Sequence, residues 1–278
     1  MFLAIKKISG KGKSNIKDIE RGVTVKINIR EIQDEVFSIF KLFDAYCRAN
    51  DLRYYLIGGS MLGAVRHGGF IPWDDDMDVG MPRSDYKKFA LGMQSFLDEQ
   101  KVNALVQCSD IDKDFPFDFI KIMKKVIISG KEIEIFLDVF PLDGCPYSDQ
   151  KRIKRYFQKF DILRFMKDSH YMTLQNKNIL KKTIVLLLRL CPLSVYKKVM
   201  DNYLEKHDFD DSVSAGNFPG RYREKEIVEK AFFGTPKLIK FEDGMYYGVE
   251  HADAYLTAIY GNYMVPTPVD ERETHFDI

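Results

Sequence analysis

The sequence contains no apolar run long enough to cross a membrane. The longest candidate, residues 184–188, is interrupted by Arg189, whereas a spanning helix needs about 20 apolar residues. At the N-terminus the five apolar residues 1–5 precede Lys6 and Lys7, which reverses and shortens the order of a secretory signal peptide. These absences predict a cytoplasmic protein.

Cysteine is scarce as well. The chain of 278 residues has four, Cys47, Cys108, Cys145 and Cys191, and their wide separations match no zinc-binding spacing. Disulfides are not expected in a cytoplasmic protein. We therefore expect all four to be small core residues.

The chain as a whole carries almost no net charge: its formal charge is only +1. The distribution is nevertheless uneven: residues 151–200 contain thirteen Lys or Arg and two acids, whereas the rest of the chain has 29 bases and 39 acids. Such asymmetry indicates that one face meets an anionic partner.

The order of periodic segments predicts a mixed chain followed by a helical part. Residues 1–28 are weakly patterned and read as a lead-in. Ser84 is a candidate N-cap for the third helix. We expect helices at about 29–49, 60–67, 84–97, 149–168 and 178–206, and strands at about 54–57, 74–81, 104–108, 119–128 and 132–140.

The most informative stretch is residues 57–81. Gly58, Gly59 and Ser60 follow an apolar strand and begin a helix. Backbone N–H groups that no side chain shields can approach a phosphate closely. This turn is therefore a candidate phosphate cradle.

Three acids alternate some fifteen residues later, at Asp74, Asp76 and Asp78. Alternate residues of a strand share one face and lie roughly 6.6 Å apart, so these carboxylates repel one another unless a cation lies between them. Mg²⁺ is the natural occupant, with Mn²⁺ as a substitute. A solvent-facing acidic edge or a calcium site is the alternative, and Asp75 faces the other way as a structural residue. Together with the phosphate cradle, the acids point to phosphoryl or nucleotidyl transfer.

A further acid, Asp138, lies within the apolar run 135–140, where an unpaired charge is costly. It is the best candidate to complete a metal site; the alternative is a structural acid paired with a buried lysine. Lys121 occupies a similar apolar run and either meets a phosphate or pairs with Asp138.

Arg66, His67 and Trp73 lie between the glycines and the acids. Arg66 and His67 either bind phosphate or hold the loop. Trp73, the single tryptophan, is a nucleobase platform or a core residue.

These residues resemble a known family. The runs 58–67 and 71–78 closely resemble the signature of the LicD family, nucleotidyltransferase-fold enzymes of bacterial surface glycans related to fukutin and fukutin-related protein. Ser60 stands where threonine is common. Two further segments agree: residues 137–143, and a tail with Tyr260, Gly261, Met264, Pro266, Pro268 and His275, which is weak evidence alone.

The resemblance implies an α+β fold: a nucleotidyltransferase-like mixed sheet core at 29–147, then a helical lobe and mixed C-terminal segment at 148–278 that complete the site. It also implies transfer of phosphocholine from CDP-choline to a hydroxyl of a cell-surface glycan, with release of CMP. In that scheme Asp76 and Asp78, supported by Asp74, hold Mg²⁺. Asp138 completes the metal site and accepts the hydroxyl proton. Gly58, Gly59 and Ser60 cradle phosphate, with Arg66, His67 and Lys121 as further donor contacts.

Other functions remain open. Family members also use CDP-ribitol or CDP-glycerol, because the signature specifies the diphosphate end of the donor and not its head group. A choline pocket needs aromatic faces, for which Tyr246, Tyr247, Tyr255 and Tyr260 are available. A true nucleotidyltransferase and an inactive glycan- or membrane-binding protein are the remaining alternatives.

The basic stretch 151–200 has three interpretations. It forms a core helix with a solvated basic face, or it docks peripherally on the anionic inner face of the cell membrane, where a lipid-linked acceptor waits. Nucleic-acid binding is the weakest, since no recognition motif accompanies the charge, and we expect no nucleic-acid partner.

Overall fold

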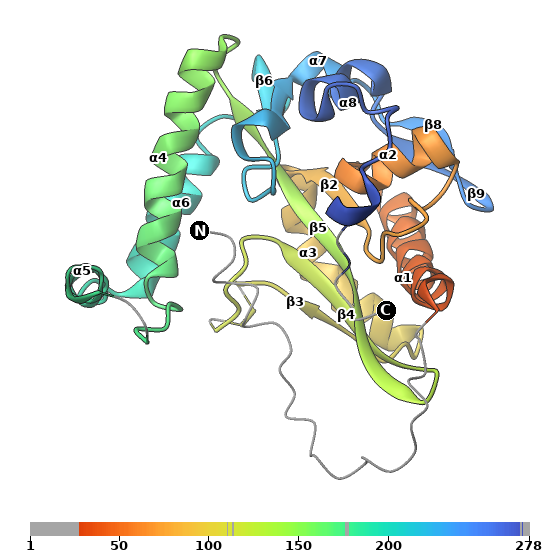
Figure 1. The fold of residues 1–278 in the computed structure, drawn as a ribbon, viewed down its shortest axis with the longest axis horizontal. Coiled ribbons are helices and arrows are strands. Elements are labelled where there is room, and N and C mark those ends of the chain that lie inside the picture. Colours follow the sequence, from red (N-terminus) through yellow and green to blue (C-terminus); the bar gives the residue numbers. More distant parts are fainter. Residues whose placement is uncertain (1–27, 110, 113, 176–177, 273, 275–278) are drawn as a thin grey trace.

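A computed structural model describes residues 28–109, 111–112, 114–175, 178–272 and 274. A mixed β-sheet runs through the molecule, helices pack on it, and a helical lobe stands at one side (Figure 1). The predicted α+β class with a mixed sheet core is confirmed. Residues 1–27 of the expected lead-in, and His275, lie outside the described residues.

The central strands combine parallel and antiparallel pairing. β2 runs parallel to β5, and β1 runs parallel to β9, while the other neighbours are antiparallel. The order across the sheet is β3 (Ala104–Gln107), β4 (Ile120–Ile128), β5 (Lys131–Cys145), β2 (Asp78–Pro82), β1 (Tyr55–Leu56), β9 (Gly244–Gly248) and β8 (Lys237–Phe241). The end of β5 also pairs with β6 (Ser214–Gly216), which pairs with β7 (Ile227–Glu229).

Helices α1 (Ile29–Ala49) and α3 (Arg83–Glu99) contact each other and the central strands. Asn28 starts α1 by accepting a hydrogen bond from the Arg30 N–H, as an N-cap residue does. The apolar positions of α1 recur every three or four residues and are buried. These residues share one core with the inward side chains of β2, β4 and β5.

The strands alternate between an apolar face and a polar one, as successive side chains must. Val79, Leu137 and Val139 belong to the apolar core and are fully buried. Their neighbours Asp78 and Asp138 therefore point to the opposite face of the sheet. The candidate site residues therefore lie on the polar face of the sheet.

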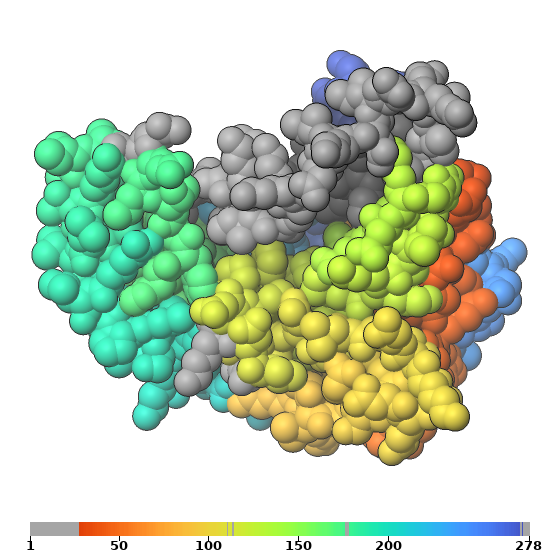
Figure 2. Space-filling model, turned by 90° about the horizontal axis from the view of Figure 1, so that it is seen from below, coloured from red at the N-terminus to blue at the C-terminus, as the bar shows by residue number. Residues whose placement is uncertain are grey.

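The lobe comprises α4 (Gln150–Asp168), α5 (Ile179–Leu188) and α6 (Leu193–Leu204) and has a core of its own, centred on Phe157, Phe160 and Phe218. Figure 2 shows the lobe projecting from the body of the molecule. The prediction of a single helix at 178–206 is wrong. The segment forms two helices, because Pro192, the N-cap of α6, has no N–H to continue a helical ladder.

Most predicted elements between residues 29 and 168 are confirmed within a few residues. The strand expected at 74–81 is paired only from Asp78 onward, and Ser84 is not a cap, since α3 begins at Arg83 with no side-chain cap bond. Cys47, Cys108 and Cys145 are buried as expected, whereas Cys191 is only half-buried.

The sequence did not predict the elements after residue 206. Besides β6 to β9, these are α7 (Lys230–Phe233), α8 (Ala252–Tyr260) and the 3-10 turns Arg223–Glu226 and Val269–Glu271. In the part of the chain that the structure describes, no helix has both the length and the apolar character needed to span a membrane.

Candidate functional site

A row of charged side chains crosses three adjacent strands on the polar face of the sheet. Asp138 of β5 is in register with Asp78 of β2 on one side and with Lys121 of β4 on the other. The Lys121 ammonium donates a hydrogen bond of 2.6 Å to Asp138 Oδ1. Strand pairing therefore brings together two predicted acids and the predicted lysine.

Asp74 and Asp76 lie in the segment that leads into β2. They are half-buried like Asp78, whereas Asp75 and Met77 between them are buried. The predicted alternation is thus present, although only Asp78 belongs to a paired strand. Gln33 of α1 holds this segment by donating to the Asp74 carbonyl at 2.8 Å.

The first turn of α2 (Gly58–His67) closes the other side of the acids. A Cβ atom at Gly59 would lie 2.9 Å from Asp74 Oδ2, and one at Gly58 would lie 3.2 Å from Asp78 Oδ2. Gly58 also has a positive φ of 53°, which side chains disfavour. Ser60 Oγ accepts a 2.8 Å hydrogen bond from the Asp78 N–H. The glycines therefore allow two carboxylates to approach the N-terminus of a helix.

The electrostatic balance at Asp78 is unfavourable to its charge. Burial raises the pKa of Asp78 well above its usual value, and the charges of Asp76, Asp138 and Asp74 raise it further. A bound cation would reverse this effect, because opposite charge favours the ionised form.

The acids fit Mg²⁺ in chemistry and in charge. All are oxygen donors, and Mg²⁺ is commonly held by one or two carboxylates together with substrate phosphates and water. Within the described residues, no three His, Cys, Asp or Glu side chains are already gathered as a complete metal centre. Mg²⁺ held by one or two of these carboxylates would leave coordination positions for substrate phosphates and water.

Residues from the C-terminal part reach the same place, and sequence reasoning missed two of them, Tyr222 and Glu226. The Tyr255 hydroxyl accepts a 3.2 Å hydrogen bond from the Gly58 N–H. The Tyr260 hydroxyl lies 3.8 Å from the position of a Gly58 Cβ. The rings of Tyr222 and Tyr260 meet edge to face with centroids 4.9 Å apart. By contrast, Tyr246 and Tyr247 pack against α1 and Tyr54.

Glu226 is buried beneath this aromatic cluster. Its carboxylate accepts a 2.7 Å hydrogen bond from the Tyr222 N–H, and burial raises its pKa to about 7. Its negative charge also contributes to the raised pKa values of Asp78, Tyr255 and Tyr260. All four residues 223–226 are charged, with alternating sign, which is typical of a solvent-exposed turn. No local signal therefore indicates that Glu226 is buried.

The structure places Arg66 and His67 against the C-terminal tail. Arg66 donates to the Tyr263 carbonyl at 2.8 Å and to His67 Nε2 at 2.9 Å. Burial and the neighbouring Arg66 lower the pKa of His67. Trp73 carries the guanidinium of Arg272 at 3.6 Å from its ring centroid. The tail thus lies against the loop that carries the acids.

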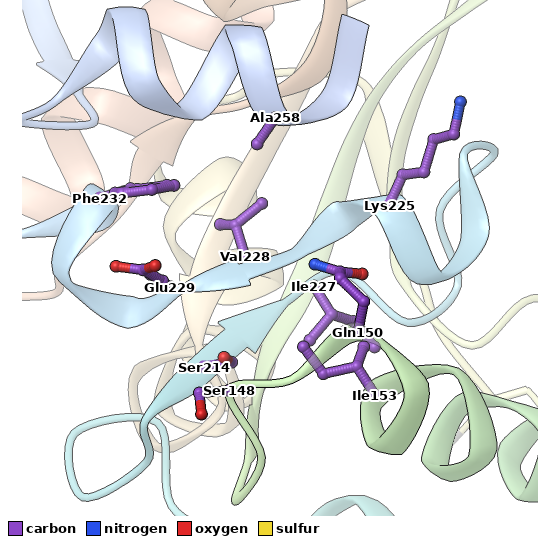
Figure 3. Close-up of a pocket in the computed structure, with 10 residues that line it drawn as sticks. All are labelled: Ser148, Gln150, Ile153, Ser214, Lys225, Ile227, Val228, Glu229, Phe232 and Ala258. Atoms are coloured by element: carbon purple, nitrogen blue, oxygen red, sulfur yellow. The ribbon is translucent and has the colours of Figure 1, made fainter. Parts of the chain in front are cut away.

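A separate pocket of about 220 Å³ lies between α8, β7 and the start of α4 (Figure 3). Ser214, whose buried hydroxyl has no hydrogen-bond partner among the residues that the structure describes, contributes to its lining. None of the predicted site acids lines this pocket, so it is not the site described above. Its lining residues are Ser148, Gln150, Ile153, Ser214, Lys225, Ile227, Val228, Glu229, Phe232 and Ala258.

A mixed sheet whose central strands present carboxylates to a glycine-led helix N-terminus is the arrangement expected of a nucleotidyltransferase-like fold. Residues 51–184 match the family described as "LicD/FKTN/FKRP, nucleotidyltransferase domain". The chain therefore resembles the LicD family through this domain.

Two relatives have described activities. The chain is 27% identical over 258 residues to the lipopolysaccharide cholinephosphotransferase LicD of Haemophilus influenzae, covering 90% of this chain and 96% of that protein. A shorter stretch of 37 residues is 57% identical to the human ribitol 5-phosphate transferase FKRP, covering 13% of this chain and 8% of that protein.

Proposed function

We propose that the protein transfers phosphocholine from CDP-choline to a hydroxyl of a cell-surface glycan and releases CMP. The observation that carries this proposal is that the acids Asp74, Asp78 and Asp138 lie beside both the N-terminus of α2 and a cluster of tyrosines. The similarity to a cholinephosphotransferase over nearly the whole chain supports it.

The donor diphosphate would lie between the first turn of α2 and the acids. Backbone N–H groups of Gly59 and Ser60 belong to a first helical turn, whose donors have no intrahelical acceptor and favour an anion. Asp76 and Asp78, with Asp74 and Asp138, would hold Mg²⁺. When bound, this cation neutralises charge on the diphosphate.

The reaction requires a base for the acceptor. The acceptor oxygen forms a bond to the phosphorus of phosphocholine, and the bond between that phosphorus and the CMP oxygen breaks. The hydroxyl proton passes to Asp138, whose orientation Lys121 maintains through the 2.6 Å hydrogen bond. A base positioned in this way contributes about 10²- to 10⁴-fold to rate.

The choice of choline rests on Tyr222, Tyr260 and Glu226. A quaternary ammonium group has no N–H to donate and is attracted by ring faces and by negative charge. Tyr222 is 42% exposed and meets Tyr260 next to Gly58, so its ring is accessible beside the expected phosphate. A polyol would instead require several hydrogen-bonding groups.

The activity can be measured by incubating the protein with Mg²⁺, a glycan acceptor and CDP-choline, CDP-ribitol or CDP-glycerol. We expect acceptor-dependent release of CMP with CDP-choline, abolished by EDTA and restored by Mg²⁺ or Mn²⁺. Pyrophosphate release from a nucleoside triphosphate would instead identify a nucleotidyltransferase. No turnover of any donor would contradict enzymatic function.

The head-group assignment has its own test in Tyr222→Ala, with Tyr222→Phe as the matched control. Loss of the ring should reduce kcat/KM for CDP-choline by about tenfold, and Phe should retain most of it. An equal decrease in kcat/KM for CDP-choline and CDP-ribitol would show that the ring does not recognise the choline group.

A polyol-phosphate transferase is the second candidate, favoured by the short stretch shared with FKRP. It predicts CMP release from CDP-ribitol in preference to CDP-choline, with Tyr222→Ala leaving the preferred donor unaffected.

A further inference from the structure

Helix α5 exposes apolar side chains to a degree that its sequence does not suggest. Only Val185 of its ten residues is buried. Leu187 is 60% exposed and Leu180 is 67% exposed. The exposed large apolar residues of this helix and the turn after it are Ile179, Leu180, Ile184, Leu186, Leu187 and Leu190. The interpretation of this segment as a core helix is therefore wrong.

The apolar residues occupy the outward face of α5. Each residue advances about 100° around a helix axis, which places Leu180, Thr183 and Leu187 roughly opposite the buried Val185. The Thr183 hydroxyl donates to the Ile179 carbonyl at 3.0 Å, so the polar group on this face is hydrogen-bonded within the helix itself. The distribution is the inverse of an ordinary surface helix, which turns its apolar stripe inward.

Exposed basic residues lie away from this face, since at about 100° per residue Lys181 and Lys182 are roughly 40° and 60° from Val185. Lys181, Lys182 and Lys198 are exposed. Two other basic residues of the region are tied to the protein: Arg189 donates to the Ser169 carbonyl at 2.9 Å, and Lys197 donates to the Ser109 carbonyl at 3.0 Å. The first three are therefore the lysines available to an external anion, while Arg189 and Lys197 help to hold α5 and α6 in place.

We infer that α5 lies flat in the surface of an anionic phospholipid bilayer, with Leu180 and Leu187 among the acyl chains and the exposed lysines of α5 and α6 reaching the headgroups. Its ten residues extend only about 15 Å, which suits a helix in the plane of the interface and not one that crosses the bilayer. Figure 1 shows α5 at the outer end of the lobe, where a flat surface can reach it.

Charge favours a bilayer over a second copy of the chain. An isologous contact through this face places the same patch against itself, which brings the exposed lysines of two copies close together without a counter-charge. An anionic lipid surface instead complements both the apolar face and the exposed lysines near it.

The test is co-sedimentation of the full chain with vesicles of phosphatidylcholine alone or with added phosphatidylglycerol, at low and high salt. We expect binding to the anionic vesicles only, weakened by salt. The double variant Leu180→Gln, Leu187→Gln should lose at least tenfold in vesicle affinity, and so should the triple variant Lys181→Gln, Lys182→Gln, Lys198→Gln.

Matched controls are exposed residues elsewhere. Leu91→Gln alters a leucine of α3 that is 87% exposed, and changing Lys131, Lys237 and Lys240 to Gln removes three exposed lysines. Both controls should bind as the wild type does, and all variants should keep its thermal midpoint. Wild-type binding that the Leu180, Leu187 pair does not affect, or a concentration-dependent dimer without vesicle binding, would overturn the inference. CMP release from the soluble donor does not depend on vesicle binding. Measuring both therefore distinguishes a protein that does not bind lipid from one that lacks the proposed activity.

Discussion

Two aspartates five residues apart on β5 have opposite electrostatic surroundings. Asp143 is buried and receives both carboxylate hydrogen bonds from a single guanidinium, that of Arg83. Asp138 receives one from Lys121 but lies in register with Asp78, whose own pKa is raised by burial and by four other acids.

The difference distinguishes a structural carboxylate from one available for chemistry. Around Asp143 the guanidinium compensates the carboxylate, so the pair has no requirement for a ligand. Around Asp138, Lys121 lies on one side and the carboxylate of Asp78 on the other, and the negative charge of the neighbouring acids favours a cation. The predictions below test whether this contrast separates catalysis from stability.

The largest effect should follow Asp78→Asn or Asp138→Asn. We expect turnover to fall by about a thousandfold or more, because each removes a carboxylate proposed to hold the cation or the proton. Stability should not fall with Asp78→Asn. A carboxylate whose folded pKa is raised costs stability as pH rises through that pKa, so the amide should be equal or better at neutral pH.

Steady-state CMP release and thermal unfolding measure the two quantities. Asp51→Asn, at an exposed turn position, is the control and should change neither. Full activity of the variant that lacks both carboxylates would end the proposed mechanism.

Asp143→Asn should produce the converse result. Arg83 would remain buried without its counter-charge, which costs about 3 kcal/mol of unfolding free energy. Denaturant unfolding measures this loss, and activity per folded molecule should be retained. If activity disappears while stability is unchanged, the contrast between the two aspartates is incorrect.

Glu226 sharpens the comparison because its carboxylate accepts from an uncharged donor, the Tyr222 N–H, and burial raises its folded pKa from 4.5 to about 7. Its raised pKa means that its contribution to stability is complete below about pH 4.5 and is lost as pH rises through 7. At about 1.4 kcal/mol per pKa unit, the loss amounts to about 3 kcal/mol.

Glu226→Gln should therefore be more stable than the wild type at pH 8 and not at pH 4.5. Urea unfolding at both pH values measures the difference. An identical pH dependence in the two proteins would show that Glu226 does not ionise as a buried group.

The smallest effect is expected for Arg66→Ala. The loss of its hydrogen bond to Tyr263 should cost about 1 kcal/mol of stability. The donor KM should rise and kcat should fall together, because the tail that Arg66 holds lies against Trp73 beside the acids. Unchanged kinetics with a lower thermal midpoint would make Arg66 a structural tie alone.

Local signals were sufficient to predict much of the domain between residues 29 and 147. Helical spacing predicted α1, apolar runs predicted β3, β4 and β5, and the alternation of Asp74, Asp76 and Asp78 predicted a shared face. Each of these depends on neighbours within a few positions, and the structure confirms the elements and the alternating burial.

The sequence by itself determined which acids, glycines and lysine the site could contain, because alternation and turn chemistry are properties of consecutive residues. Only the tertiary structure decided that Asp78, Asp138 and Lys121 stand in one row and that Tyr222 and Glu226 join them, since strand register and long-range packing set those neighbours. It also decided that α5 turns its leucines outward. A helical pattern specifies which residues share a face, but not whether another part of the chain covers that face.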